Sequence, residues 1–291
     1  MERQWAGVTF GNGWMHRNLV RLLRYADVRL IYLFADIFVV PVCLLLNRSR
    51  KTSYSYFRDI LGYGRWKSVR SVYVNHCMFA QTVIDKFAMY AGRRFDVEIE
   101  GMDRFCALAA REDGFLMLSA HIGNYEIAGY TFRSERKTIN PVVYADEKAS
   151  VMANRNKMFG KTNVSMITLG QDMDYLFEIN RVLDEGNIVS FPSDRFMGSS
   201  RSVDCVFLGR TARFPQGPFR VAAMRGLDVL AVNVLKTGLK KYMIYVTPID
   251  YDRTAERKEQ TRQLAEGYVA ELEKRLRQYP TQWYNFYDFW Q

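Results

Sequence analysis

His121 is the histidine whose surroundings in this sequence are best suited to chemistry. It follows the apolar run GFLMLSA (residues 114–120) and opens the segment HIGNYE, so Glu126 lies five residues further on. A histidine at the end of a strand can act as a general base when a carboxylate fixes its tautomer and stabilises the imidazolium. We therefore predict that His121 is a catalytic base and that Glu126 is the carboxylate that orients it.

The spacing of His121 and Glu126 limits how they can meet. On one continuous helix they would lie about 140° apart around the axis. A turn through Gly123 with a helix beginning near Asn124 removes this obstacle, and helix-start amides there favour developing negative charge, which makes Asn124 a candidate binding residue. The same spacing also suits a strand-terminal histidine capped by a glutamate for stability alone, so spacing leaves both interpretations open.

Several other kinds of site lack their usual signatures. The patterns GxSxG, GxxxxGK[ST], HExxH and GxGxxG are absent, which argues against a nucleophile elbow, a P-loop, a zincin and a dinucleotide site. The four cysteines form no CxxC unit, which argues against a zinc ribbon or a disulfide scaffold and favours a reducing compartment. We predict no metal and no cofactor. The mechanism that remains is a base that activates a substrate nucleophile directly.

The charge balance favours an anionic partner. The chain has 41 Lys and Arg against 31 Asp and Glu, a net charge of +10, with 48% hydrophobic residues. A nucleic acid, an acidic membrane surface and an acidic carrier protein all satisfy this charge. No zinc-finger spacing or RNA-binding signature accompanies it, so we predict no nucleic-acid partner.

Short apolar runs alternate with helical patterns after residue 95. The predicted strands are residues 95–101, 114–120, 139–145, 164–170, 187–193, 227–235 and 242–249, and the predicted helices are 173–185 and 254–278. This alternation predicts an α/β fold with a central mixed sheet flanked by helices, whose functional groups lie at strand ends. We predict one such domain over residues 93–291, preceded by a helical region over residues 1–92.

The N-terminal region contains the most apolar segment of the chain, residues 30–46, flanked by arginines and lysine. A spanning helix needs about 20 apolar residues. This segment has 17 and includes Asp36 and Pro41, so a helix in the membrane interface or docked on the core is favoured over a simple crossing. Residues 66–91 have helical apolar spacing that predicts a core-facing helix.

The chain ends in PTQWYNFYDFWQ, with six aromatic residues among the last nine. An exposed cluster of this kind would contact a membrane or a partner, and a tail docked on the domain is equally consistent with this sequence. Residues 115–118 and this tail would line a slot for a long apolar ligand, although core packing accounts for such residues equally well.

Three blocks in this order resemble the lysophospholipid acyltransferase superfamily, and most closely its lipid A biosynthesis acyltransferase branch. HIGNYE after an apolar strand looks like the HX4D/E block. SDRF (193–196) and FLGRTARFPQGPFRVAAMRGLDVLAV (207–232) are similar to its later block, and QWYNFYDFW is similar to its tryptophan-rich ending. The resemblance covers most of the chain and implies a glycerolphosphate-acyltransferase-like sheet with an apolar N-terminal membrane helix.

The resemblance also implies binding residues. In the later block Asp194 braces the site, Arg195, Arg210 and Arg213 are candidates for binding acidic groups, and Pro215 with Gly217 shape the adjoining loop. The family commonly carries Asp-Gln where this chain has Asp194 and Arg195, and a basic ending where this chain has aromatic residues. These departures leave the acceptor open.

The implied function is transfer of a fatty acyl group from an acyl-carrier protein or acyl-CoA thioester to a hydroxyl or amine of an amphiphilic lipid or glycolipid. The implied location is the cytoplasmic face of the bacterial inner membrane, peripheral or with one membrane-embedded helix. The alternative is a catalytically inactive lipid- or membrane-binding module of the same fold. The presence of both His121 and Glu126 favours the enzyme.

Overall fold

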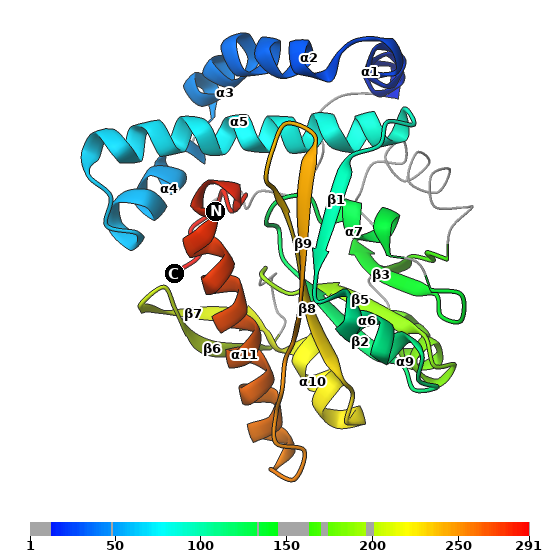
Figure 1. Ribbon diagram of the computed structural model, residues 1–291. Helices are drawn as coiled ribbons and strands as arrows, with labels where there is room; N and C mark the ends of the chain where they lie inside the picture. The colour runs from blue at the N-terminus through cyan, green and yellow to red at the C-terminus, as the bar shows by residue number, and fades with distance from the viewer. Residues whose placement is uncertain are drawn as a thin grey trace.

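The computed structural model describes residues 13–47, 49–132, 134–144, 163–169, 174–195 and 201–290. A seven-stranded sheet lies at the centre with helices on both faces, and a layer of N-terminal helices runs across one end of it (Figure 1). The last helix and the C-terminal segment pass from the far end of the molecule back to this layer. The predicted α/β architecture with a mixed central sheet is confirmed.

All seven predicted apolar runs contain strands of the central sheet. They are β1 (Asp96–Glu100), β2 (Phe115–Ser119), β3 (Ile139–Tyr144), β4 (Ile167–Leu169), β5 (Ile188–Pro192), β8 (Val229–Lys236) and β9 (Lys241–Pro248). Their order is β1-β9-β8-β2-β5-β3-β4, and only the β8–β9 pair is antiparallel among these neighbours. Parallel β2 and β5 therefore end at the same edge of the sheet.

Strand β2 is buried on both faces, as its unbroken apolar run requires. Leu116 and Leu118 face one core, and Phe115 and Met117 face the other. The helices that cover the sheet are α6 (Met102–Ala109), α7 (Glu126–Thr131), α9 (Asp174–Asp184), α10 (Gln216–Arg225) and α11 (Arg257–Gln278). The residues of β2 serve as core, one of the two roles that the sequence allowed.

A two-stranded antiparallel hairpin, β6 (Ser202–Phe207) and β7 (Arg210–Pro215), lies beside α11 and was not predicted. Its two-residue turn has Leu208 and Gly209 at φ 52° and 82°, the positive values that a tight hairpin turn needs. Leucine is uncommon at positive φ, which is why the sequence gives little sign of the turn.

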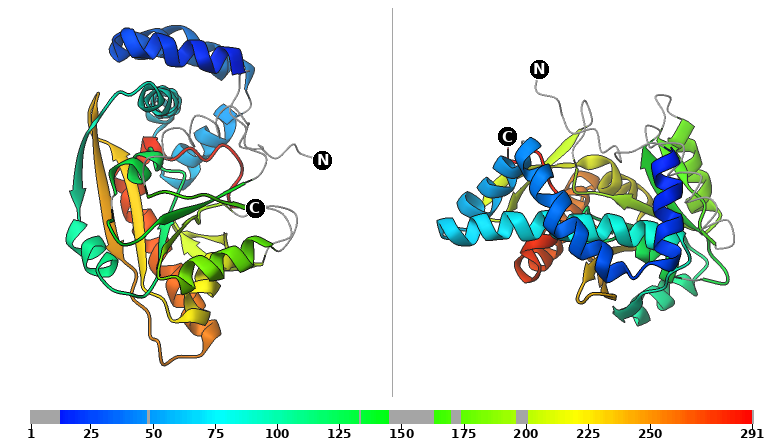
Figure 2. Two further views of the ribbon diagram at one scale, coloured as in Figure 1. Left: turned by 90° about the vertical axis from the view of Figure 1, so that its right-hand side faces the viewer. Right: turned by 90° about the horizontal axis from the view of Figure 1, so that it is seen from above.

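The regular structure of the N-terminal layer, where it is described, is helical. Its helical segments are α1 (Gly13–Tyr25), α2 (Val28–Phe34), the π-helical turn η1 (Ala35–Val39), α3 (Val40–Leu46), α4 (Ser49–Ser55), the π-helical turn η2 (Tyr56–Ile60) and α5 (Arg65–Tyr90). Figure 2 shows α5 crossing beneath the α1–α3 segment, between it and the sheet. Leu23, Tyr32 and Phe87 belong to the small core that joins α1 and α2 to α5.

The apolar segment predicted at residues 30–46 is helical from Val28 to Leu46, with a mean hydropathy of 2.2, and is long and apolar enough to cross a membrane. Pro41 lacks an amide hydrogen and crowds the preceding turn, and the backbone N of Val40 donates to the carbonyl of Ala35 in the widened turn η1. The helix therefore continues past the proline.

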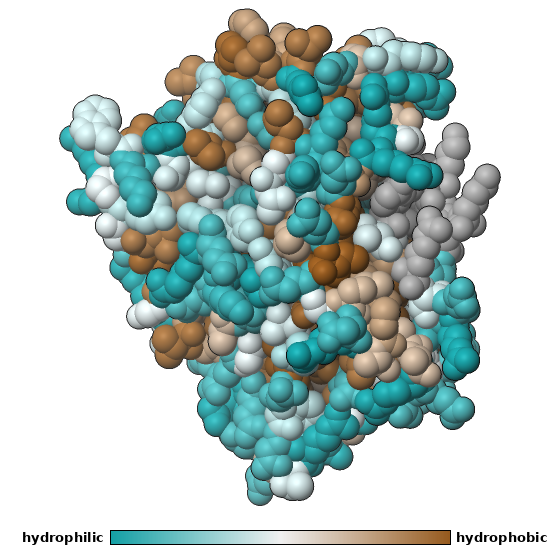
Figure 3. Space-filling view, in the orientation of Figure 1, coloured by the Kyte–Doolittle hydropathy of each residue, from teal (hydrophilic) through white to brown (hydrophobic). Residues whose placement is uncertain are grey.

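One side of this helix is exposed and apolar. Its large exposed residues are Leu30, Leu33, Phe34, Ile37, Phe38, Val39, Val42, Leu45 and Leu46, and we call them the apolar ridge. Figure 3 shows hydrophobic atoms gathered at the top of the molecule, over α2 and α3. On the opposite side Gln81 of α5 donates to Asp36 Oδ2 (3.0 Å), and Tyr73 Oη donates to the carbonyl of Asp36 (2.7 Å). The one acidic residue of η1 thus joins the helix to α5.

A buried polar cluster connects α2, α5 and the sheet. The Asp85 carboxylate of α5 accepts hydrogen bonds from Tyr32 of α2 and Tyr242 of β9, and it pairs with Lys236 Nζ of β8 at 2.5 Å. Asp85 and Lys236 are each at most 5% exposed. Burial raises the pKa of Asp85 and lowers the pKa of Lys236, so each charge depends on the other.

Breaking this pair should destabilise the fold strongly. Asp85→Leu leaves the Lys236 ammonium buried without its carboxylate, and we expect the free energy of unfolding to fall by about 3–5 kcal/mol. In Asp85→Leu/Lys236→Met no charge is left behind, so the loss should be smaller than the sum of the two single losses. Glu266→Ala, which breaks the exposed Arg262–Glu266 pair, is the control, with an expected loss of about 0–1 kcal/mol. Denaturant unfolding in detergent measures these changes, and strictly additive losses would contradict the expectation.

Candidate active site

His121 lies just beyond the carboxyl end of β2, in a loop that is held tightly against β8. Gly123 has φ 56°, and a Cβ atom on it would lie 1.9 Å from the carbonyl oxygen of Val234. Only glycine fits at this position, because both the dihedral and the close approach exclude a side chain. The backbone N of Asn124 donates to the same Val234 carbonyl (2.9 Å). The predicted turn through Gly123 is present, and α7 begins at Glu126.

The carboxylate that holds His121 belongs to Asp194. His121 Nδ1 lies 2.7 Å from Asp194 Oδ1, and the backbone N of His121 donates to Asp194 Oδ2 at 3.0 Å. The sheet explains the meeting: Ser119 of β2 pairs with Pro192 of β5 in the parallel ladder. His121 and Asp194 each follow two residues later, so they leave adjacent strands in the same register.

Asp194 is buried and remains ionised. Burial opposes its charge, but the attraction and hydrogen bonding of His121 and the charge of Arg195 outweigh burial and lower the pKa of Asp194 to about 2. An ionised carboxylate only accepts hydrogen bonds, so the Nδ1 atom of His121 carries the proton. In the neutral imidazole Nε2 then has the lone pair that a general base needs.

The ring nitrogen Nδ1 of His121 is held by Asp194, and the role of Glu126 in orienting the ring stays a prediction. Glu126 is the first residue of α7, and both of its oxygens bind groups of α5. Oε1 pairs with Lys86 Nζ at 2.6 Å, and Oε2 accepts from Tyr90 Oη at 2.9 Å. Because α7 starts at Glu126, this side chain connects the loop to the N-terminal layer.

The arginines of the predicted site lie in two places. Arg195 is beside Asp194 and donates through Nη2 to the carbonyl of Tyr284 (3.2 Å). Arg210 and Arg213 lie on β7 and are exposed, and Arg210 Nη2 donates to the carbonyl of Asp59 in η2 (3.1 Å).

The remaining predicted binding residues have backbone roles in the structure. Asn124 is buried in the His121 loop. Pro215 precedes α10 as its N-cap residue, and Gly217 lies in the first turn of α10. Phe196 of the SDRF segment lies outside the described residues.

The aromatic C-terminal segment docks against the site, and sequence reasoning left its role open. The backbone N of Gly123 donates to the carbonyl of Gln282 (2.8 Å), and the backbone N of Tyr284 donates to the carbonyl of His121 (3.0 Å). Trp283 Nε1 donates to Asp194 Oδ2 at 3.3 Å. The segment therefore contacts the backbone on both sides of Ile122 and the carboxylate itself.

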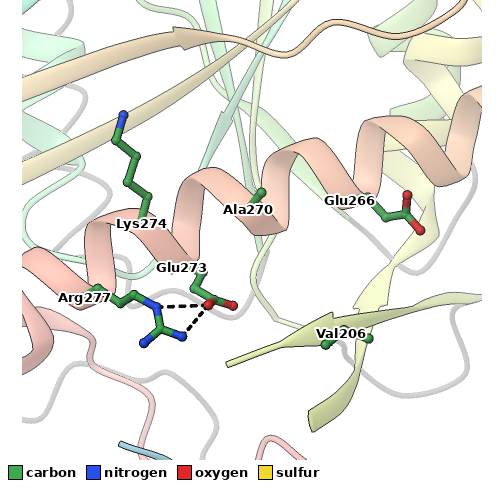
Figure 4. Close-up of a pocket in the computed structure, with 6 residues that line it drawn as sticks. All are labelled: Val206, Glu266, Ala270, Glu273, Lys274 and Arg277. Atoms are coloured by element: carbon green, nitrogen blue, oxygen red, sulfur yellow. Dashed lines mark hydrogen bonds and ion pairs between the residues drawn. The ribbon is translucent and has the colours of Figure 1, made fainter. Parts of the chain in front are cut away.

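A hollow of about 560 Å³ lies between β6 and α11 and is lined by Val206, Glu266, Ala270, Glu273, Lys274 and Arg277 (Figure 4). Charged side chains of α11 dominate its wall, and Glu273 and Arg277 bind each other (2.6 Å). Neither His121 nor Asp194 lines it, so this hollow is not the slot expected beside the base. Within the described part of the chain, no group of three or more His, Cys, Asp or Glu residues could hold a metal ion.

Residues 67–291 match the family model described as bacterial lipid A biosynthesis acyltransferase. The chain belongs to this family. The matched segment contains nearly all of α5, the whole sheet, the His121 loop, Asp194 and the aromatic end. Membership in the lipid A biosynthesis acyltransferase family makes the chain an acyltransferase of lipid biosynthesis, which confirms the resemblance seen in the sequence.

The chain is also similar to a solved structure, the 1-acyl-sn-glycerophosphate (LPA) acyltransferase PlsC from Thermotoga maritima. The identity is 14% and the TM-score 0.40, covering 94% of this chain and 100% of that chain. Comparison with curated proteins gives no match.

Proposed function

We propose that this family member transfers a fatty acyl group from a thioester donor to a hydroxyl or amine of an amphiphilic lipid or glycolipid, with His121 as the general base. Nε2 removes the proton of the acceptor as its oxygen or nitrogen attacks the thioester carbonyl. The carbon–sulfur bond then breaks, and the thiolate takes the proton from the imidazolium. The thioester is supplied by an acyl-carrier protein or by coenzyme A.

The contact between His121 and Asp194 is the observation that carries this proposal. A buried carboxylate on Nδ1 fixes the tautomer, orients the ring, and stabilises the imidazolium that forms when the acceptor is deprotonated. No covalent enzyme intermediate is needed, because the base acts on the acceptor directly. We assign Glu126 a positioning role. Its contacts with Lys86 and Tyr90 fix the start of α7 beside the His121 loop.

The cationic side chains of the predicted site suit an anionic substrate. Arg195 adjoins Asp194, and Arg210 and Arg213 extend along β7. Guanidinium groups bind phosphate and carboxylate oxygens through paired hydrogen bonds. We assign these three arginines to the acidic groups of the donor or the acceptor, and Asn124, Pro215 and Gly217 to shaping the adjoining loops.

The assay for this activity measures thiol release from acyl-CoA and from acyl-carrier protein in the presence of a lipid acceptor. Mass spectrometry of the lipid identifies the product. Release that depends on the acceptor, with one acyl group added to the lipid, supports the transferase. Lipid binding without thiol release from either donor would instead favour the inactive lipid-binding module.

The N-terminal layer, within residues 1–92, is proposed as the membrane-associating region. The first 94 residues carry 15 Lys and Arg against 5 Asp and Glu, and the remaining residues carry 26 against 26. The whole net charge of +10 is therefore carried by the first 94 residues, which include the helix of the apolar ridge. This combination fits a helix lying in the interface of an anionic leaflet, such as the cytoplasmic face of the bacterial inner membrane.

Vesicle binding tests this proposed membrane association. We expect tighter binding to vesicles with anionic lipid than to neutral ones, with the difference decreasing as salt rises, because each surface cation contributes about 1 kcal/mol. Phe38→Glu, which places a charge in the apolar ridge, should weaken binding to both. Phe177→Glu is the matched control, since Phe177 is 74% exposed on α9 of the sheet domain. Binding that resists high salt and tolerates Phe38→Glu would contradict the expectation.

A further inference from the structure

We propose that Trp283 is a positioning residue for the Asp194–His121 pair, a role that rests on the proposed function. Its indole N–H donates to Asp194 Oδ2 (3.3 Å), the oxygen that also accepts from the backbone N of His121 (3.0 Å). The other oxygen, Oδ1, faces His121 Nδ1 at 2.7 Å. The two oxygens of one carboxylate are thus held by different groups.

This arrangement fixes the rotation of the carboxylate. Turning the Asp194 carboxylate about its Cβ–Cγ bond moves both oxygens together, so it would break both hydrogen bonds to Oδ2 as well as the contact between Oδ1 and Nδ1. Hydrogen bonds to charged groups contribute about 1.5–3 kcal/mol each. The indole of Trp283 therefore keeps Oδ1 directed at the imidazole of His121, and its hydrogen bond partly offsets the negative charge of the carboxylate.

Trp283 is itself held from several directions. It is 3% exposed, and its ring packs against Tyr56, Phe207 and Phe289 at centroid distances of 5.3, 5.6 and 5.2 Å. Its carbonyl accepts from Asn75 Nδ2 of α5 at 2.9 Å, and its backbone forms a bridge with Ile122. An indole fixed in this way has one donor, and that donor is directed at Asp194.

The surrounding segment holds the base from the other side. Gln282 and Tyr284, the neighbours of Trp283, bind the backbone of Gly123 and His121. The Gln282 side chain also binds both backbone groups of Lys236 in β8, with Oε1 accepting from N (2.8 Å) and Nε2 donating to O (2.7 Å). One short segment thereby fixes the base, its carboxylate and the strand beneath the loop relative to one another.

The test replaces the donor and keeps an aromatic ring. In Trp283→Phe we expect kcat to fall about 10- to 100-fold, the value of one hydrogen bond to a charged group, with KM changed less than about threefold. The acid limb of the pH profile should move to higher pH, because a carboxylate with fewer donors stabilises the imidazolium more strongly. In an Asp194→Asn background the same substitution should have much less effect.

Trp290→Phe is the matched control. Trp290 belongs to the same aromatic cluster, 5.9 Å from Trp283, but its indole N–H donates to the carbonyl of Phe207 (3.2 Å). We expect kcat and the pH profile of Trp290→Phe to stay close to those of the unchanged protein. Equal behaviour of the two variants, in a protein that is active and loses activity in His121→Ala, would overturn the role of Trp283 and leave the proposed function standing.

A second measurement needs no tryptophan substitution. The indole N–H proton of Trp283 in a hydrogen bond to a carboxylate should resonate further downfield than it does opposite an amide oxygen. In NMR spectra of Asp194→Asn we therefore expect the Trp283 signal to move upfield and the Trp290 signal to stay. A Trp283 signal that is unchanged by Asp194→Asn would show that the contact does not exist in solution, and the proposal would be wrong.

Discussion

Replacing His121 with alanine should reduce acyl transfer by about 10²- to 10⁴-fold, the contribution of a positioned general base. The ring of His121 is a partner of the buried Asp194 carboxylate, so the melting temperature should also fall, and turnover is compared well below that temperature. The measurement is acceptor-dependent thiol release, with the acylated lipid quantified by mass spectrometry.

His76→Gln provides the control for His121→Ala. His76 is a buried histidine of α5 that contacts Ser49 Oγ (3.2 Å) and the carbonyl of Val72 (2.9 Å). Removing this ring should lower the melting temperature through lost packing and leave turnover of the folded protein close to normal. If His121→Ala retained near-normal turnover, the general-base mechanism would have to be abandoned, whatever the family of the chain.

The sheet could be predicted from sequence because its strands carry their own signal. The run at β2 is apolar throughout, as burial on both faces requires, and a five- to eight-residue length with turn residues on either side separates it from a helix. The β6–β7 hairpin escaped prediction because its turn uses Leu208 at φ 52°, where Asn or Gly would have indicated it. Local residue types thus determined which elements were recognisable.

The contact between Asp194 and the ring of His121 could not be predicted in the same way. Glu126 is five residues from His121, whereas Asp194 is 73 residues away, and residue periodicity carries no information about which strands are neighbours. Strand order and register bring Asp194 to the base. A signal did exist: SAH begins at the last residue of β2 and PSD at the last residue of β5, so His121 and Asp194 lie at equal distances beyond two buried runs. Using it would have required the β2–β5 pairing in advance.

Asp194→Asn should lower kcat by about 10²- to 10⁴-fold. The amide that replaces the carboxylate loses the negative charge that stabilises the imidazolium, and its NH₂ group can face Nδ1 and favour the wrong tautomer. Because the pKa of Asp194 lies at about 2, the native carboxylate is ionised throughout the neutral range, and the loss should persist from pH 6 to 8. Steady-state kinetics across this range measures it.

Glu126→Gln is the substitution that distinguishes the two carboxylates. The glutamine can still accept from Tyr90, but Lys86, whose side chain is 15% exposed, loses its ion pair with Glu126. Breaking such a pair costs about 3–5 kcal/mol when fully buried, so the main effect should be on stability, with a melting temperature lower by several degrees. Below the unfolding temperature the kcat of Glu126→Gln should exceed that of Asp194→Asn by at least about tenfold, because the His121 tautomer is still fixed. The reverse order would show that Glu126 orients the base during turnover, and Asp194 would then be left as the brace that the sequence alone suggested.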